Sequence, residues 1–340
     1  MKPIRTAVLA AIAAGSLALT ACGGAAQPES AASGPTESKP VTLMLNWYPY
    51  GEHAAFYYGV EEGIFKKHGI DLTIKAGQGS TKTVQATGQG QMDFGWADTP
   101  AVLANVDKGV KVKSLGVYLQ TTPSAVQVFA DSGIKTVADL KGKTIATSAG
   151  DAPSVTFPLF LKAAGLAETD VKQQNLDAAG KVAAVLSNKV DGLIGFAHDQ
   201  GPTIAAKSGK AMTYLRYSDQ GINFYSNGLI SSDDYLAKNP ELAKQMMAAV
   251  SESFTAAIAN PEAAAKSMEG KDPQVPAQAV VLEQWTETIK LLNTSATKGK
   301  NPGINDPADW ASTIKTLSGA GLIGEGSDAS KYFDSQYQPK

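Results

Sequence analysis

Residues 46–58 carry the side chains needed to hold a small planar molecule. They include six of the chain's 25 aromatic residues (4 Trp, 11 Tyr and 10 Phe), together with an asparagine, a glutamate and a histidine. Aromatic faces stack on planar rings, and amide, carboxylate and imidazole groups make directional hydrogen bonds. For at least one of Phe56, Tyr57 and Tyr58, packing of a helix onto a sheet is the better explanation. From this segment we expect ligand contacts from Asn46, Trp47, Tyr50, Glu52, His53 and Tyr57.

Four more turns carry polar or aromatic side chains where a predicted strand ends and a helix begins. They lie at residues 77–80, 96–99, 148–154 and 196–199. Backbone N–H groups at a helix start can hold an acceptor on a ligand, although the same residue types also serve as helix caps. For Ser154 the two interpretations are equally good. These turns, and the segment at 221–227, add Ser80, Trp96, Asp98, Asp151, Ser154, Asp199, Asn223 and Tyr225 to the expected site.

The charges at these turns indicate the character of the ligand. The expected site contains four acids, and none of its turns contains an arginine. A dedicated anion site is expected to use an arginine fork, whereas acids beside aromatic rings suit a planar, amine-bearing or cationic heterocycle. Arg216 is the only arginine after residue 5. It either reaches a ligand carboxylate or, more simply, pairs with a nearby acid.

The elements that must position these residues alternate between strands and helices. Alternation of apolar and polar residues indicates strands, helical periodicity indicates helices, and proline near several starts marks a helix N-terminus. Strand–helix–strand units at this spacing predict a largely parallel α/β sheet. Strands are predicted at 41–45, 70–74, 92–96, 126–130, 144–147, 190–194 and 229–231, and helices at 54–67, 81–89, 137–140, 155–164, 181–187, 240–259, 261–268, 276–292 and 308–320.

The α/β pattern occurs twice, and this repetition predicts two lobes. We expect residues 40–124 and 226–340 to form lobe 1, and residues 125–225 to form lobe 2. The chain would then cross between the lobes near 122–126 and again near 221–227. Two crossings make a two-segment hinge, and the cleft that it frames is the expected ligand site.

The first residues of the chain indicate export. Lys2 and Arg5 precede an apolar run at 7–20, which is shorter than the roughly 18 or more apolar residues of a membrane span. The run ends at Leu19-Thr20-Ala21-Cys22, so we expect a lipoprotein signal peptide at 1–21, lipidation of Cys22 and a flexible tether at 22–39. Acyl chains on Cys22 would hold the protein on the outer face of a membrane. The alternative is an ordinary secretory signal with an accidental cysteine.

Composition excludes several classes of function. Without Lys2 and Arg5, 28 basic and 32 acidic side chains remain, a net charge of −4 that argues against a nucleic-acid partner. A single cysteine excludes an intramolecular disulfide and a cysteine-rich zinc site. His53, His68 and His198 lack metal-ligand spacing. We therefore expect no metal, no cofactor and no catalytic constellation, and we expect a monomer.

Several motifs occur in an order that resembles a known family. They are Leu45-Asn46-Trp47-x-Pro49 followed by His53 and Tyr57, then 62–72 (Glu-Gly-Ile-Phe-Lys-Lys-His-Gly-Ile-Asp-Leu), Gly79-Ser80, 91–95 (Gln-Met-Asp-Phe-Gly) and 139–143 (Asp-Leu-Lys-Gly-Lys). Together they resemble the NMT1/THI5-like binding proteins, whose relatives bind nitrate, sulfonates and taurine. The resemblance implies a bilobal type II periplasmic-binding-protein fold that closes on its ligand. It also implies that the protein docks on the permease and ATPase subunits of an ABC importer.

The Asn-Trp-x-Pro…His pattern is similar to the pyrimidine-binding branch of this family, in which an aromatic residue stacks on the ring. The chain departs from that branch at Tyr50-Gly51-Glu52, where an Asn/Thr-rich stretch is usual. The cysteine-rich motif of the eukaryotic pyrimidine synthases is missing. We therefore expect a non-catalytic binder of a planar nitrogen heterocycle, foremost a thiamine pyrimidine precursor. A sulfonate, nitrate, aromatic acid or flavin remains the alternative ligand.

Overall fold

The computed structural model describes residues 38–339, which belong to one compact unit. The predicted signal peptide, the predicted lipidation site Cys22 and the predicted tether up to residue 37 lie outside the described residues. Within residues 38–339, no helix is long and apolar enough to cross a membrane.

The first of two sheets has five strands in the spatial order β2-β1-β3-β10-β4. β1 is parallel to β2 and β3, whereas β10 is antiparallel to β3 and β4. The prediction of a largely parallel sheet was therefore wrong for β10, which lies antiparallel between β3 and β4. The strands are β1 (Lys39–Met44), β2 (Ile70–Lys75), β3 (Phe94–Asp98), β4 (Val112–Val117) and β10 (Asn227–Ser232), and the helices between them are α1 (Ala54–Glu61), α2 (Ile64–Lys67), α3 (Ser80–Gly88) and α4 (Thr99–Asp107).

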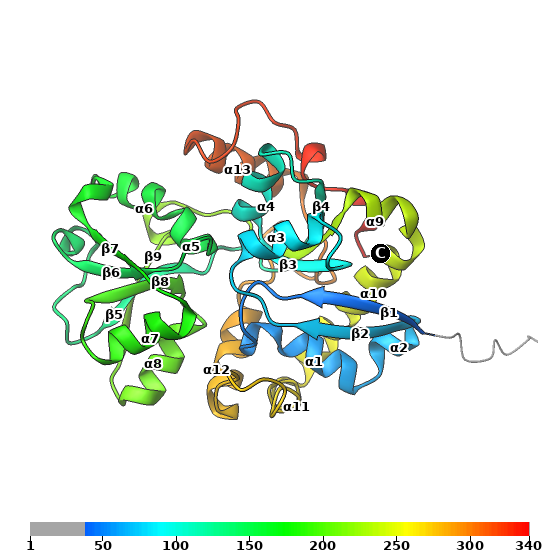
Figure 1. Ribbon diagram of the computed structural model, residues 1–340, viewed down its shortest axis with the longest axis horizontal. Coiled ribbons are helices and arrows are strands. Elements are labelled where there is room, and N and C mark those ends of the chain that lie inside the picture. The colour runs from blue at the N-terminus through cyan, green and yellow to red at the C-terminus, as the bar shows by residue number, and fades with distance from the viewer. Residues whose placement is uncertain (1–37, 340) are drawn as a thin grey trace, which may run out of the picture. The chain divides into compact units, whose positions relative to one another are not determined.

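The second sheet repeats this plan with the spatial order β7-β6-β8-β5-β9. β6 is parallel to β7 and β8, and β5 is antiparallel to β8 and β9. Figure 1 shows α5 and α6 on one face of this sheet and α7 and α8 on the other. The elements are β5 (Ser124–Phe129), β6 (Thr144–Thr147), β7 (Lys172–Asn175), β8 (Gly192–Phe196), β9 (Met212–Arg216), α5 (Ala152–Val155), α6 (Phe157–Ala163), α7 (Ala178–Leu186) and α8 (Gln200–Ser208).

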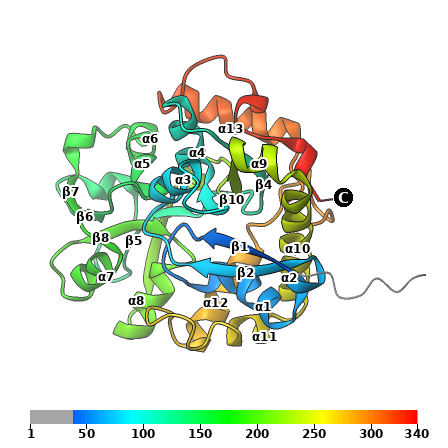
Figure 2. The same cartoon turned by 45° about the vertical axis from the view of Figure 1, so that its right-hand side comes forward.

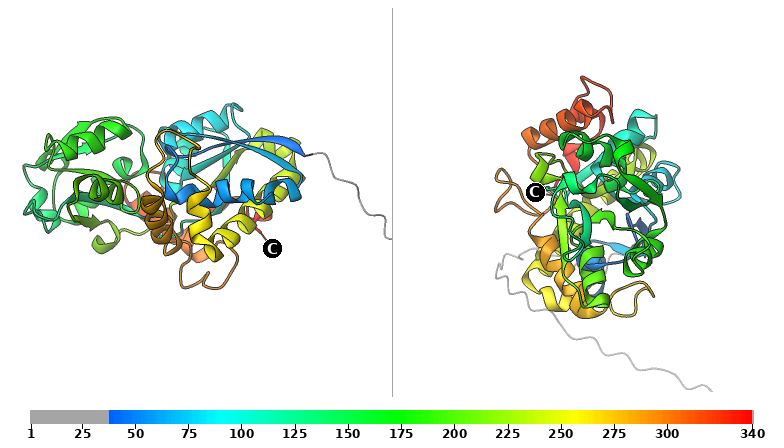
Figure 3. Two further views of the ribbon diagram at one scale, coloured as in Figure 1. Left: turned by 90° about the horizontal axis from the view of Figure 1, so that it is seen from below. Right: turned by 90° about the vertical axis from the view of Figure 1, so that its left-hand side faces the viewer.

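The helices after β10 belong to the first sheet. α10 and α11 pack against α1, and α12 packs against α11 (Figures 2 and 3). α10 begins at a proline in its first turn and buries a face that includes Met246, Val250 and Phe254. The Phe254 ring lies 5.7 Å from that of Trp96 and 4.7 Å from that of Tyr118, measured between centroids, so α10 fixes the centre of this core. These helices are α9 (Asp233–Lys238), α10 (Pro240–Ala259), α11 (Pro261–Lys266), α12 (Gln278–Ile289) and α13 (Pro307–Gly319).

Two segments connect the sheets, one after β4 and one before β10, and they pair with each other. The Ser226 N–H donates to the Leu119 carbonyl at 2.8 Å, and the Leu119 N–H donates to the Asn227 carbonyl at 3.0 Å. The Thr122 N–H donates to Asn223 Oδ1 at 3.1 Å. Two paired crossings of this kind suit a hinge, because few backbone angles must change when two lobes move.

Some predicted elements were broken or missed for local reasons. The predicted helix at 54–67 breaks at Gly63, whose φ of 69° interrupts the helix, and the predicted helix at 155–164 divides before Phe157. β7 has the sequence Lys-Gln-Gln-Asn at an exposed sheet edge, so it has no apolar alternation to detect. β4, β9, α4, α8 and α9 were not predicted.

A short 3-10 turn, Gly51–His53 (η1), holds residues 46–53 against α12. A Cβ on Gly51 would lie 2.5 Å from the Val281 carbonyl oxygen and 2.7 Å from the Trp285 backbone nitrogen. Both neighbours are backbone atoms of a packed helix, so neither can move away without displacing α12.

We therefore expect Gly51→Ala to lower the free energy of unfolding by about 1–3 kcal/mol, measured by urea denaturation. Gly319→Ala is the matched control, because a Cβ there meets nothing within 4 Å at the end of α13. The control should leave the free energy of unfolding nearly unchanged. Equal stabilities for the two variants would contradict the proposed close approach of η1 to α12.

Candidate functional site

A cavity of about 30 Å³ lies where strand ends of the two sheets meet. Ligands of open α/β sheets bind at the carboxyl ends of the strands. The loop after β1 is held by two backbone bonds, from the Gly77 N–H to the Trp47 carbonyl (2.9 Å) and from the Gly79 N–H to the Asn46 carbonyl (2.8 Å). The cavity is lined by Asn46, Trp47, Tyr50, Gly79, Ser80, Asp151, Ala152, Pro153, Lys181, Gly195, Phe196, Asp199 and Gln200.

Aromatic side chains from both lobes surround this cavity. Trp47, Tyr48 and Tyr50 form one buried cluster with Ala152 and Phe196. The Trp47 and Tyr48 rings are tilted by 41° with centroids 5.8 Å apart. Flat rings supplied from opposite lobes suit a planar ligand held between them.

Lys181 is a site residue that sequence reasoning missed. Its side chain is 1% exposed, and its Nζ donates to Asp151 Oδ2 at 2.7 Å and to the Ile194 carbonyl at 2.9 Å. The ammonium also lies 5.2 Å from the centre of the Trp47 ring. The available signal was a lone lysine in the otherwise uncharged helix α7. The lining contains no arginine, as the sequence predicted, but this buried lysine supplies a positive charge there.

Glu52 lies behind the cavity and is completely buried. Its carboxylate accepts hydrogen bonds from the Tyr50 hydroxyl, Trp96 Nε1 (2.6 Å), Asn227 Nδ2 (2.5 Å) and His198 Nε2 (2.9 Å). Burial alone would raise the pKa of Glu52. The hydrogen bond and charge of His198, together with His53 and Tyr50, outweigh burial and lower this pKa to about 2.

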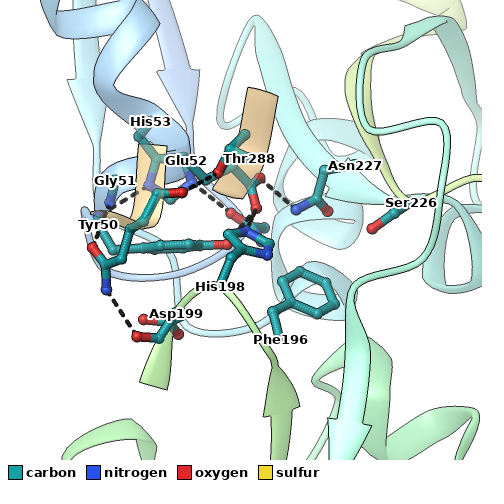
Figure 4. A network of polar contacts seen from close by, with 12 residues as sticks. Tyr50, Gly51, Glu52, His53, Phe196, His198, Asp199, Ser226, Asn227 and Thr288 are labelled. Carbon is teal, nitrogen blue, oxygen red and sulfur yellow. Dashed lines mark hydrogen bonds and ion pairs between the residues drawn. The ribbon is translucent and has the colours of Figure 1, made fainter. Parts of the chain in front are cut away.

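Three sets of contacts join the lobes around this carboxylate (Figure 4). His198 follows β8 in the second sheet, whereas the other three partners of Glu52 belong to the first. The Tyr48 hydroxyl donates to Asp199 Oδ1 at 3.2 Å. Gln284 of α12 accepts from the Gly51 N–H at 2.8 Å and donates to the Asp199 carbonyl at 2.8 Å. These contacts hold the lobes together. The cavity between them, about 30 Å³, is far smaller than the roughly 300–1,000 Å³ of a pocket for an organic ligand. A ligand therefore needs the lobes to separate before it can enter.

Two acids near the cavity have pKa values shifted toward neutrality. Burial raises the pKa of Asp98 to about 8, opposed by the hydrogen bond from Ser226 and reinforced by Glu52 and Asp151. Burial also raises the pKa of Asp199 to about 7, with Lys181 and Tyr48 opposing the shift. Burial lowers the pKa of His53 to about 4. The Tyr50 N–H donates to His53 Nδ1 (3.3 Å), so the proton sits on Nε2 and points to Asn46 Oδ1 at 2.8 Å.

The structure gathers some of the predicted site residues and separates others. Asn46, Trp47, Tyr50, Ser80, Asp151 and Asp199 line the cavity. Glu52, His53, Trp96 and Asp98 are buried next to that lining. The N-cap of α5 is Asp151, which accepts from the Ser154 N–H, and the Ser154 hydroxyl accepts from the Ser148 N–H in the preceding turn.

Three predicted site residues and Arg216 lie elsewhere. Tyr57 packs against the first hydrophobic core, Asn223 bonds Thr122 in the connecting segments, and Tyr225 packs on Trp310. Arg216 stacks on Tyr214, outside the cavity lining. Tyr48, Phe196, His198, Gln200, Asn227 and Gln284 surround the site without having been singled out.

A bilobal α/β architecture with its cavity between two sheets defines the class of proteins with a periplasmic-binding-protein fold. Residues 51–264 match the family described as NMT1/THI5 like, and the chain belongs to that family. Riboflavin-binding protein RibY of Chloroflexus aurantiacus is 25% identical over 95% of both chains. The formylaminopyrimidine-binding protein of Halalkalibacterium halodurans is 23% identical over 82% of this chain and 84% of its own.

Other relatives set limits on what the family implies. A Brucella abortus protein, whose name gives it a binding role without a ligand, is 27% identical over 59% of this chain, and the match covers only 62% of that protein. One relative is named as an enzyme, the 4-amino-5-hydroxymethyl-2-methylpyrimidine phosphate synthase of Legionella pneumophila, with 22% identity over 88% of this chain and 92% of its own. Among solved structures, the aliphatic sulphonate binding protein SsuA of Escherichia coli has a TM-score of 0.65, 17% identity and coverage of 88% and 94%. That likeness confirms the predicted type II periplasmic-binding-protein fold.

The raised pKa of Asp98 predicts how stability depends on pH. Because this pKa lies at about 8 in the folded protein and near 3.8 in an exposed carboxyl, the folded state binds the extra proton between those values. The contribution of Asp98 to stability is thus complete below pH 3.8 and is lost as the pH rises toward 8.

We expect Asp98→Asn to lose less stability than the wild type between pH 5 and pH 8, measured as the free energy of unfolding in urea. Asp199 shifts in the same direction, so the variant should keep part of the slope. Asp219→Asn, at an exposed position, is the control and should behave as the wild type. A slope in Asp98→Asn as steep as that of the wild type would refute this assignment.

Proposed function

We propose that this protein is the substrate-binding component of an ABC importer and that it captures a small planar nitrogen heterocycle between its lobes. The observation that carries the proposal is the cluster of Trp47, Tyr48 and Tyr50 with Phe196 of the second sheet. Trp47, Tyr50 and Phe196 line the cavity, and rings from two sheets around one cavity are suited to hold a flat ring. A thiamine pyrimidine precursor is the first candidate, and the formylaminopyrimidine-binding relative supports it.

The polar groups of the lining support a heterocycle rather than a simple anion. Asn46, Ser80 and Gln200 offer both donors and acceptors, and Asp199 adds an acceptor. The lining's one cation, Lys181, is already paired with Asp151. Arg216, which an anion site would need in the cavity, lies over Tyr214 instead. A sulfonate, nitrate or aromatic acid therefore fits this lining less well.

A flavin is the second candidate ligand. The riboflavin-binding relative matches 95% of this chain and 95% of its own length. A flavin also presents a flat ring edge with donors and acceptors, and its extra size would need a wider opening of the lobes. The same aromatic cluster serves either ring system.

The proposal includes an extracytoplasmic location, a lipid anchor at Cys22, a monomeric state and no catalysis. The expected division into lobes at 40–124 with 226–340 and at 125–225 belongs to the same proposal. Around the cavity, Lys181 is held by Asp151 and Ile194, and Glu52 is held by four donors. Because Lys181 and Glu52 are held by these partners, we assign them a role in shaping the binding site and not in catalysis.

Isothermal titration of the purified protein against hydroxymethylpyrimidine, formylaminopyrimidine, riboflavin, taurine and nitrate tests the ligand class. We expect tight binding of at least one heterocycle and no heat from the two anions. Tight binding of taurine or nitrate, with no response to any heterocycle, would overturn the proposal.

Trp47→Ala should weaken binding of the responding heterocycle by about 10–100-fold, because stacking contributes roughly 1–3 kcal/mol per ring. Trp47→Phe, which keeps an aromatic face, should recover most of the affinity. Tyr57→Phe is the control outside the cavity lining and should bind as the wild type. Unchanged affinity in Trp47→Ala would exclude stacking on this ring.

Cys22→Ser tests the anchor separately from the ligand. In an exporting bacterial host, the wild-type protein should partition into the detergent phase of a Triton X-114 extraction, and Cys22→Ser should move to the aqueous phase. Because Cys22 is the only cysteine, no second thiol can substitute for it. A wild-type protein found wholly in the aqueous phase would refute lipidation.

A further inference from the structure

Three buried polar atoms around Glu52 have no hydrogen-bond partner within the protein. They are Asp98 Oδ2, Asn227 Oδ1 and His198 Nδ1. All three side chains are at most 3% exposed. More than nine in ten buried polar groups in proteins are paired, so three unpaired atoms in one place call for a common explanation.

The three residues that carry these atoms are linked by the register of the first sheet and by Glu52. Asn227 of β10 lies directly opposite Asp98 of β3 in the antiparallel register, which brings their side chains together on one face of the sheet. Asn227 and His198 both bond the carboxylate of Glu52, one on each oxygen. Figure 4 shows Asn227, His198 and Phe196 around the same space. The group therefore contains residues from both lobes, as the lining of the cavity does.

Hydrogen-bond chemistry fixes what each unpaired atom offers. The ionised Glu52 only accepts, so the amide nitrogen of Asn227 and the Nε2–H of His198 must face it. Asn227 Oδ1 is then an acceptor. Asp98 Oδ1 accepts from the Ser226 hydroxyl at 2.5 Å, and with its pKa raised to about 8 by burial Asp98 carries its proton on Oδ2 at neutral pH. The group thus presents one acceptor and one donor, with the unpaired His198 Nδ1 beside them.

The cavity lies next to this group, with two rings between them. Tyr50 and Phe196 both line the cavity. The Tyr50 hydroxyl bonds Glu52, and the Phe196 ring stacks on His198 with centroids 5.7 Å apart. A ligand ring stacked among the aromatic side chains would therefore direct a substituent past these two rings toward the unpaired atoms.

We propose that Asp98, His198 and Asn227 form an inner subsite that binds a hydroxyl-bearing substituent of the heterocycle. A hydroxyl group donates one hydrogen bond and accepts others, which matches the acceptor of Asn227 and the donor of Asp98. A carboxylate or sulfonate only accepts, and it would meet the acceptor of Asn227 beside the buried charge of Glu52. The inner subsite rests on the proposed heterocycle-binding function and adds a preference for ligands with a neutral hydroxyl.

Matched ligand pairs test the inner subsite. The purified full-length protein is titrated with 4-amino-5-hydroxymethyl-2-methylpyrimidine and with 4-amino-2,5-dimethylpyrimidine, and separately with riboflavin and with lumichrome, which lacks the hydroxylated chain. We expect the hydroxylated member of the responding pair to bind at least tenfold more tightly. Equal affinity within that pair would overturn the inner subsite while leaving heterocycle binding intact. No binding of any of the four compounds would overturn the proposed function instead.

Variants of Asp98 separate ligand recognition from folding. Asp98→Ala removes the donor and should reduce the preference to less than twofold, without weakening the analogue that lacks the hydroxyl. Asp98→Asn keeps a donor at the same place and should retain most of the preference. Asn223→Ala, in the connecting segments, is the control and should keep all of it. Equal weakening of both ligands by Asp98→Ala, or no effect on either, would overturn the subsite.

Discussion

The buried carboxylate of Glu52 is the group on which the arrangement of the site depends. Removing an ionised carboxylate from water is costly, and only hydrogen bonds to both oxygens offset that cost. Three of its donors come from the first lobe: Tyr50, which caps η1, Trp96 of β3 and Asn227 of β10. The fourth, His198, comes from the second lobe. Full solvation of this charge within the protein therefore requires the two lobes to be in contact.

This dependence explains why the aromatic residues converge. The contact that places His198 on Glu52 also places Asp199 on Tyr48 and Phe196 in one cluster with Trp47 and Tyr50. The Lys181–Asp151 pair, by contrast, lies wholly within the second lobe. Its charges are therefore paired without any group from the first lobe. Charges that cross the interface thus stabilise the contact between the lobes, and charges within one lobe shape the wall of the site.

Sequence patterns predicted the parts of the fold that have local causes. Most of the predicted strands and the helices at 240–259 and 308–320 follow from periodicity, and several strand-end turns do line the cavity. Pairing across the chain has no local signal. Glu52 and His198 are 146 residues apart, and Asn227 reaches Glu52 only because β10 inserts between β3 and β4. Trp96 was expected among the ligand-binding residues. Instead its ring packs in the core, and its indole N–H donates a hydrogen bond to Glu52.

The electrostatics of the site also differ from a simple count of its acids. Four carboxyl groups at strand ends suggested a cationic ligand, but burial raises the pKa of Asp98 to about 8 and that of Asp199 to about 7. Lys181 balances Asp151, and four donors surround Glu52. The site is therefore much closer to neutral at physiological pH than its acids imply. A neutral heterocycle with both donors and acceptors matches that balance better than either a strong cation or an anion, because neither charge would find an uncompensated partner.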